Sequence, residues 1–199
     1  MSNLQKIGGI AAIMEATIYI SAFVFFGAIW EFPSTASLTE KLAFLKENQA
    51  VLAIVNLTMY VVFGILLTVL VMALHERLKV KTAVLSQAAS IFGLIWVGLV
   101  IASGMIANIG LGTVIELSAK EPELAKTVWL VTDSVVEGIG GGNEIVGGLW
   151  VLLLSCAAIK GQVFSKKLNY LGLGVGLAGV STVYPADVLT ELFGISQVI

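Results

Sequence analysis

Several carboxylic acids interrupt the long apolar runs of this 199-residue chain, whereas all eleven Lys and Arg residues lie outside those runs. Glu15 lies in the first run, and Asp133, Glu137 and Glu144 lie in the fourth. An ionised carboxylate in hydrocarbon costs several kcal/mol unless something compensates it. Because no basic side chain is available at that depth, we expect these acids to be protonated, to hydrogen-bond to neighbouring helices, or to hold a cation.

Two hypotheses compete for these acids. In the structural one, Glu15 and Glu144 are protonated and join helices by hydrogen bonds to amide or hydroxyl groups, for which Gln87 is a further candidate. In the functional one, a polar cavity opens outward past Asp133 and Glu137 and binds a cation or relays protons. The candidate ligand- or ion-binding residues are Glu15, Asn56, Tyr60, Asp133, Glu137, Asn143 and Glu144.

The composition predicts the kind of secondary structure that positions these residues. Hydrophobic residues make up 58% of the chain and charged residues 12%, with a mean hydropathy of +0.99. A soluble domain carries about 25% charged residues, and a membrane span needs about 20 mostly apolar residues. We therefore expect an all-α polytopic membrane bundle in a single domain, residues 1–199. The predicted spans are 7–30, 50–74, 83–115, 127–159 and 168–186, with an outer amphipathic helix over 38–47 and the start of a sixth span after Glu191.

The basic residues predict the orientation. If the chain crosses the membrane five times, seven Lys and Arg residues lie on one side with a single acid, Glu76. The positive-inside rule makes that side cytoplasmic. The N-terminus is then cytoplasmic as well. The seven basic residues are Lys6, Arg77, Lys79, Lys81, Lys160, Lys166 and Lys167. The other side holds most of the acids, including Asp187 and Glu191.

The fourth run combines acids with glycines. In a continuous helix Asp133, Glu137 and Glu144 fall on one face. The glycines between Gly138 and Gly142 favour either a helix broken beside a cavity or a continuous helix with a close neighbour. At 1.5 Å per residue, Glu144 and Asn56 fall at about the same depth, and Asp133 and Glu137 fall at or above the outer boundary.

Local motifs predict how helices start and pack. Ser37-x-x-Glu40 and Ser118-x-x-Glu121 both match a capping box, and the second is followed by Pro122. Small residues at steps of four predict close helix packing. The steps are Gly8/Ala12/Ala16, Gly138/Gly142 and Gly172/Gly176.

The segment 133–150 contains Gly-Gly-Gly-Asn-Glu-Ile-Val-Gly-Gly-Leu-Trp, and Met-Ile-Ala-Asn-Ile-Gly-Leu-Gly precedes it at 105–112. With Leu-Asn-Tyr-Leu-Gly at 168–172, this pattern resembles the DUF4386-type family of uncharacterised bacterial membrane proteins. The resemblance implies a small helical bundle of about six spans and supplies no catalytic residue.

The favoured function is transporter-like handling of a cation, a proton or a small polar solute by the intramembrane carboxylates. The alternative is a non-catalytic accessory subunit, with the lipid bilayer and other membrane subunits as partners. An enzyme is least favoured, because His75 is the only histidine and no metal-ligand cluster or cofactor motif is present. The net charge of −2 suggests no nucleic-acid role. The expected location is the bacterial inner membrane.

Overall fold

A computed structural model describes residues 3–141, 145–184 and 186–196. Every secondary-structure element in these ranges is helical, which confirms the all-α prediction. The α-helices are α1 (Asn3–Val24), α2 (Leu38–Glu47), α3 (Gln49–Asn56), α4 (Phe63–Ser118), α5 (Pro122–Val136), α6 (Ile145–Gly161), α7 (Lys166–Ser181) and α8 (Asp187–Ser196). Three π-helical segments lie between or after them: η1 (Phe25–Ile29), η2 (Leu57–Val62) and η3 (Glu137–Gly141).

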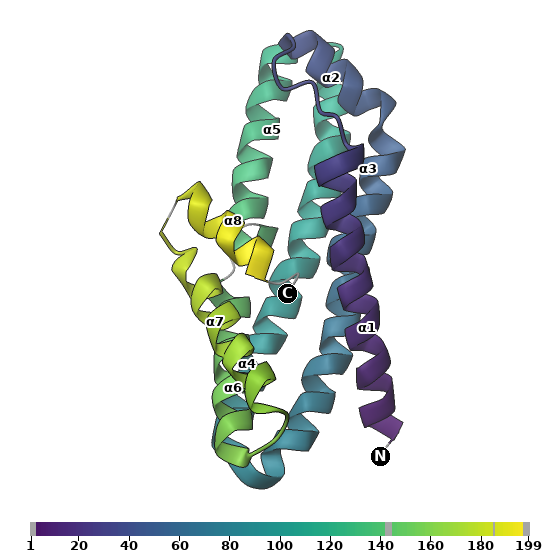
Figure 1. Ribbon diagram of the computed structural model, residues 1–199. Coiled ribbons are helices and arrows are strands. Elements are labelled where there is room, and N and C mark those ends of the chain that lie inside the picture. The colour runs from purple at the N-terminus through teal and green to yellow at the C-terminus, as the bar shows by residue number, and fades with distance from the viewer. Residues whose placement is uncertain (1–2, 142–144, 185, 197–199) are drawn as a thin grey trace.

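Helix α4 reverses direction at Thr82, whose backbone is non-helical at φ −141° and ψ 53°. Its two limbs, 63–81 and 83–118, run side by side in opposite directions (Figure 1). The reversal is closed by Ser86, whose Oγ lies 2.9 Å from Nδ1 of His75 and donates to the His75 carbonyl at 3.2 Å. His75 therefore helps to join the two limbs of α4 next to the reversal.

Two helical stretches of the described chain have the length and composition to cross a membrane. They are Asn3–Ile29, of 27 residues, and Gln49–Ser118, of 70 residues. The second contains the reversal at Thr82 and so passes twice along the bundle. Ile145–Gly161 is apolar but shorter.

The main hydrophobic core lies between the two limbs of α4 and α6. Trp96 and Trp150 meet in it with ring centroids 5.6 Å apart. Next to it, α6 and α7 pack backbone to backbone. A Cβ on Gly176 would lie 2.7 Å from the Leu152 amide nitrogen, and one on Gly148 would lie 2.6 Å from that of Val180. The predicted packing role of Gly176 is thus confirmed.

Helix α1 packs on α4 through a different set of small residues from the one predicted. Its buried residues are Gly8, Ala11 and Glu15. Gly8 faces Ala73, and the Gln5 side chain donates to the Ala73 carbonyl at 2.7 Å. Ala16 is exposed, so the predicted Gly8/Ala12/Ala16 step is wrong. The helix turns one face to its neighbour, and that face follows spacings of three and four residues instead of four alone.

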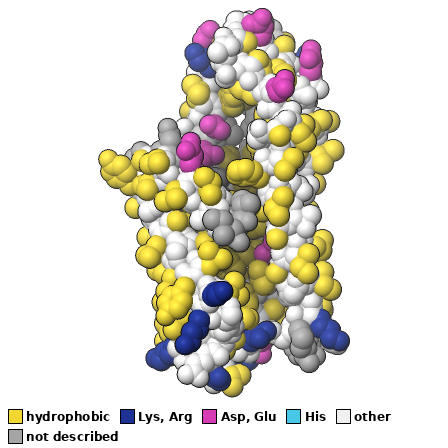
Figure 2. All heavy atoms as spheres, viewed as in Figure 1, with side chains coloured by type: hydrophobic (Ala, Val, Ile, Leu, Met, Phe, Trp, Pro, Cys, Tyr) yellow, Lys and Arg dark blue, Asp and Glu magenta, His cyan; other side chains and the backbone are white. Residues whose placement is uncertain are grey.

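Charge divides the molecule into two ends (Figure 2). Lys and Arg side chains gather at the lower end, which we call the basic end, where α1 begins and α4 reverses. Asp and Glu side chains gather at the upper end, the acidic end, around α2 and the turn between α4 and α5. At the basic end Arg77 also stacks on the Phe164 ring, 4.6 Å from its centroid.

One predicted capping box is confirmed and the other is wrong. Ser37 caps α2: its side chain accepts from the Glu40 amide, and the Glu40 carboxylate accepts from the Ser37 amide at 2.8 Å. Ser118 instead donates to the Ile115 carbonyl at 2.7 Å and so belongs to the end of α4. Helix α5 begins with Pro122 at its first turn and has no side-chain cap.

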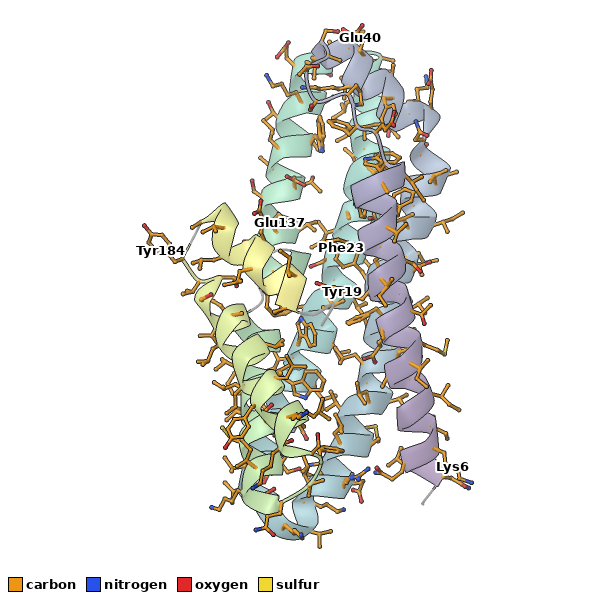
Figure 3. The ribbon with its side chains drawn as sticks, in the orientation of Figure 1. Lys6, Tyr19, Phe23, Glu40, Glu137 and Tyr184 are labelled. Carbon is orange, nitrogen blue, oxygen red and sulfur yellow. The ribbon has the colours of Figure 1, made fainter. Side chains whose placement is uncertain are left out.

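The chain after α7 does not follow the predicted path. Helix α7 has 16 residues, which at 1.5 Å per residue span about 24 Å, less than the roughly 30 Å of a bilayer core. It therefore turns near mid-height, where Tyr184 lies, and α8 packs back on α7 (Figures 1 and 3). The prediction placed Glu191 on the outer side just before a sixth span; in the structure it lies within α8, which packs on α7.

Candidate functional site

A cavity of about 290 Å³ lies in the half of the bundle nearer the acidic end. Its walls come from every element between η1 and η3, so distant parts of the sequence meet there. The lining residues are Phe26, Trp30, Phe32, Leu45, Leu52, Asn56, Tyr60, Ala107, Gly110, Leu111, Val114, Trp129, Thr132, Asp133, Val136 and Glu137. Four of the seven predicted site residues are among them: Asn56, Tyr60, Asp133 and Glu137.

Each of the three π-helical segments contributes one residue to this cavity. These are Phe26 from η1, Tyr60 from η2 and Glu137 from η3. A π-turn inserts an extra residue into a helix, widens it, and occurs frequently at functional sites. At η3 the Ser103 hydroxyl, which is fully buried, donates to the Val136 carbonyl at 3.5 Å. The prediction did not include η1 and η2, whereas at η3 the glycines from Gly138 onward had signalled a disturbance of the helix as one of two alternatives.

Asp133 and Glu137 place two acids on the α5–η3 wall. Their four-residue spacing predicts one shared face, and both line the cavity while their side chains are exposed, so the cavity reaches the surface. In Figure 3 Glu137 lies near mid-height. A close contact beside them fixes the height of Asp133 and Glu137 along the bundle. At Gly110 of α4 a Cβ would clash with the side chain of Thr132, the residue before Asp133.

This close approach corrects the predicted depth of the two acids. Gly110 is two residues from Asn108, which bonds to Asn56, so Asp133 lies about level with Asn56 and Glu137 one turn further inside. The predicted depth was counted along one helix from the cytoplasmic end of the fourth run. It placed Asp133 and Glu137 too close to the outer surface. That count assumed one regular helix, whereas the chain enters the π-helical segment η3 at Glu137.

A pair of asparagines supports the cavity from the α3–α4 side. Asn56 Nδ2 donates to Asn108 Oδ1 at 3.1 Å, and Asn108 Nδ2 donates to the Ala53 carbonyl at 3.2 Å. Asn108 was not among the predicted site residues, although it is a polar residue within a long apolar run. The pair fixes the amide of Asn56 at the cavity wall.

Aromatic rings form the wall nearest the acidic end. Phe32 meets Trp129 with centroids 5.6 Å apart, and Phe44 packs behind both Trp30 and Phe32 at 4.9 and 5.8 Å. These rings come from the segment after η1, from α2 and from α5. Leu42 and Leu45 of α2 are buried beneath them, so the capped α2 holds the ring cluster in place.

Glu15 does not join the cavity. It is buried in α1, with 7% of its surface exposed, on the face that packs against α4. Its Oε1 atom and the Trp96 Nε1 atom are buried without a hydrogen-bond partner among the described residues. In the described chain the only ion pair joins Lys79 and Glu76 at the basic end, 2.6 Å apart.

The remaining candidates contribute less. Asn143 and Glu144 lie outside the described residues, and the structure describes η3 only as far as Gly141. Whether the fourth run is continuous beyond Gly141 stays a prediction. Nothing lies within 4 Å of where a Cβ on Gly138 would be, so within the described part of the chain no close helix explains it. Gln87, a predicted partner for the acids, has an exposed side chain near the α4 reversal.

Comparison of the chain with protein-family models, curated proteins and solved structures finds no match. The resemblance noted from residues 105–112, 133–150 and 168–172 therefore stays a prediction.

Proposed function

We propose that this chain is a multi-pass protein of the bacterial inner membrane that takes a cation, a proton or a small polar solute into the cavity from the outer side. The observation that carries the proposal is the cavity itself. Two carboxylates line it, and none of its described lining residues is Lys, Arg or His. A pocket of net negative charge favours a positive or proton-donating occupant.

The topology in this proposal has five spans plus the start of a sixth, with the N-terminus in the cytoplasm. The separation of charge supports it, because basic residues gather at one end of the bundle and the positive-inside rule makes that end cytoplasmic. The apolar stretches 3–29 and 49–118 supply the first three spans. Helices α5 and α6 together supply the fourth, and α7, at about 24 Å, supplies only part of the fifth.

Binding of a cation or a proton is favoured because it relieves the repulsion between the Asp133 and Glu137 carboxylates. Asp133 and Glu137 lie on consecutive turns, and like charges at this spacing destabilise a helix by about 0.2–0.5 kcal/mol in water. The repulsion grows where protein and lipid exclude water, because the effective dielectric constant falls. A cation or a proton relieves it. Asn56 and Thr132 add polar atoms that orient the occupant.

The test uses the purified full chain in proteoliposomes adsorbed to a sensor membrane. Rapid concentration jumps of K⁺, protons or tetramethylammonium are applied, and the displaced charge is recorded. We expect a transient current that Glu137→Gln removes and that Glu123→Gln keeps, since Glu123 lies on the same helix outside the cavity. Absence of current from all three jumps, or equal currents from the two variants, would contradict the proposal.

The accessory-subunit alternative rests on the Asn56–Asn108 pair, which shows that polar groups in this bundle also join helices. Under that alternative a partner should co-purify with the chain from native membranes in fixed ratio. Glu137→Gln should then leave the function of the complex unchanged.

A further inference from the structure

We infer that the cavity binds a small organic cation of the alkylammonium class, with its charged nitrogen between the aromatic rings and the α5–η3 carboxylates. This inference rests on the proposed function and adds the chemical class of the occupant. It depends on what lines the cavity, on the lack of a three-residue metal-ligand cluster among the described residues, and on the cavity size.

Five aromatic rings line the cavity. They are Phe26, Trp30, Phe32, Tyr60 and Trp129. The face of an aromatic ring attracts a cation within about 6 Å of its centroid, and the attraction strengthens when water is excluded. Phe44 packs behind Trp30 and Phe32, so these two rings are held in place before any ligand arrives. Such walls are used to recognise alkylated ammonium groups.

The oxygen atoms of the cavity suit an ammonium group better than a metal ion. Ca²⁺ takes about six to eight oxygen ligands, and Mg²⁺ requires near-octahedral oxygen geometry. The described residues contain no cluster of three or more His, Cys, Asp or Glu side chains that could hold a metal. Asp133 and Glu137 supply charge from the α5–η3 wall, where Trp129 lies one turn before Asp133; the other four rings come from η1, the segment after it and η2. A charged nitrogen that carries apolar carbon atoms can contact both the carboxylates and the aromatic rings.

The size of the cavity limits the ligand. Small-molecule pockets usually measure about 300–1,000 Å³. At about 290 Å³ this cavity lies at the lower end of that range, so it fits an ion with a few carbon atoms and not a drug-sized molecule.

The test measures binding of tetramethylammonium chloride to the purified full chain in detergent by calorimetry, with neutral tert-butanol as the size-matched comparison. We expect tetramethylammonium to bind at least tenfold more tightly than tert-butanol. Trp129→Leu should weaken tetramethylammonium binding about 3- to 30-fold, the range of one desolvated cation–π contact. Trp129→Phe keeps a ring and should retain most of the affinity, and Glu137→Gln should weaken binding about tenfold.

Two control variants lie outside the cavity. Phe23→Leu removes an exposed ring from α1, and Glu123→Gln removes an exposed acid from α5. Both should stay within about twofold of the parent chain. Circular dichroism and gel filtration of each variant report whether it is folded.

The outcomes separate the two proposals. Equal binding of the cation and the alcohol, or equal losses in Trp129→Leu and Trp129→Phe, would overturn the organic-cation inference. If K⁺ or proton jumps still give a current that depends on Glu137, the proposed function stands without it. If no jump gives a current, the proposed function fails. Tetramethylammonium binding that depends on Trp129 would still support the inference about the ligand.

Discussion

Polar side chains in the interior of this bundle act in two distinct ways. Asn108 bonds within the protein, to Asn56 and to the Ala53 carbonyl, and holds α3 against α4. Asp133 and Glu137 line the cavity, where their charges act on whatever enters. Both kinds of residue are polar interruptions of apolar runs. Only their neighbours in space distinguish a residue that joins helices from one that binds a solute.

Glu40 gives a test at the scale of one residue. Hydrogen bonds from the Ser37 side chain, and then from its backbone amide, hold the pKa of Glu40 below its ordinary value. A lowered pKa stabilises the folded helix above the ordinary pKa of a glutamate, and this contribution is lost as the pH falls through the lowered value. Acidification should therefore loosen the start of α2 and the aromatic rings that it carries.

The measurement is a pH titration of the Glu40 carboxyl carbon by NMR in detergent micelles. Ser37→Ala should raise the pKa of Glu40 toward its ordinary value. Thr39→Ala, an exposed neighbour outside the box, should leave it unchanged. An unchanged pKa in Ser37→Ala would show that the capping box does not persist in solution.

Among the elements, the π-helical segments distinguish this bundle most. Segment η1 follows α1, η2 lies between α3 and α4, and η3 follows α5, and each places a residue at the same cavity. A π-turn costs hydrogen-bond geometry, so its repetition around one space indicates that the cavity is built by these distortions.

The contact between α6 and α7 gives a test at the element scale. A Cβ on Gly176 would meet backbone atoms of α6 at 2.7 and 2.9 Å, whereas one on Gly174 would meet nothing within 4 Å. Gly176→Ala should lower the free energy of unfolding by about 1–3 kcal/mol, because backbone cannot move aside easily. Gly174→Ala should be neutral or should stabilise α7 by up to about 1 kcal/mol.

Unfolding of both variants in mixed micelles provides the comparison. Because the two positions lie on one helix two residues apart, differences in helix propensity cancel. Equal destabilisation would show that α6 and α7 are not packed as described.

At the scale of the whole molecule, the separation of charge determines how the bundle is oriented. The lone Cys156 can be replaced by Ala, and a single new cysteine can then be placed at an exposed site at either end. Ala119→Cys marks the acidic end and Val80→Cys the basic end; Val80 is 81% exposed.

On intact cells a membrane-impermeant maleimide should label Ala119→Cys and not Val80→Cys. After permeabilisation it should label both, which controls for reactivity. On intact cells, labelling of Val80→Cys alone would show that the orientation is the reverse of the proposed one. Labelling of both on intact cells would show that the residues at the two ends are not separated by a membrane.

The amino-acid sequence by itself determined the helical class, the charge difference between the ends, the Ser37–Glu40 cap and the shared face of Asp133 and Glu137. Each of these depends on composition or on residues within about four positions of one another. Only the tertiary structure decided that Asn56 pairs with Asn108, 52 residues away, and that aromatic rings from distant segments line one cavity with the acids. The tertiary structure also separated Glu15 from them. These outcomes follow from which helix faces meet, and local periodicity does not specify a partner.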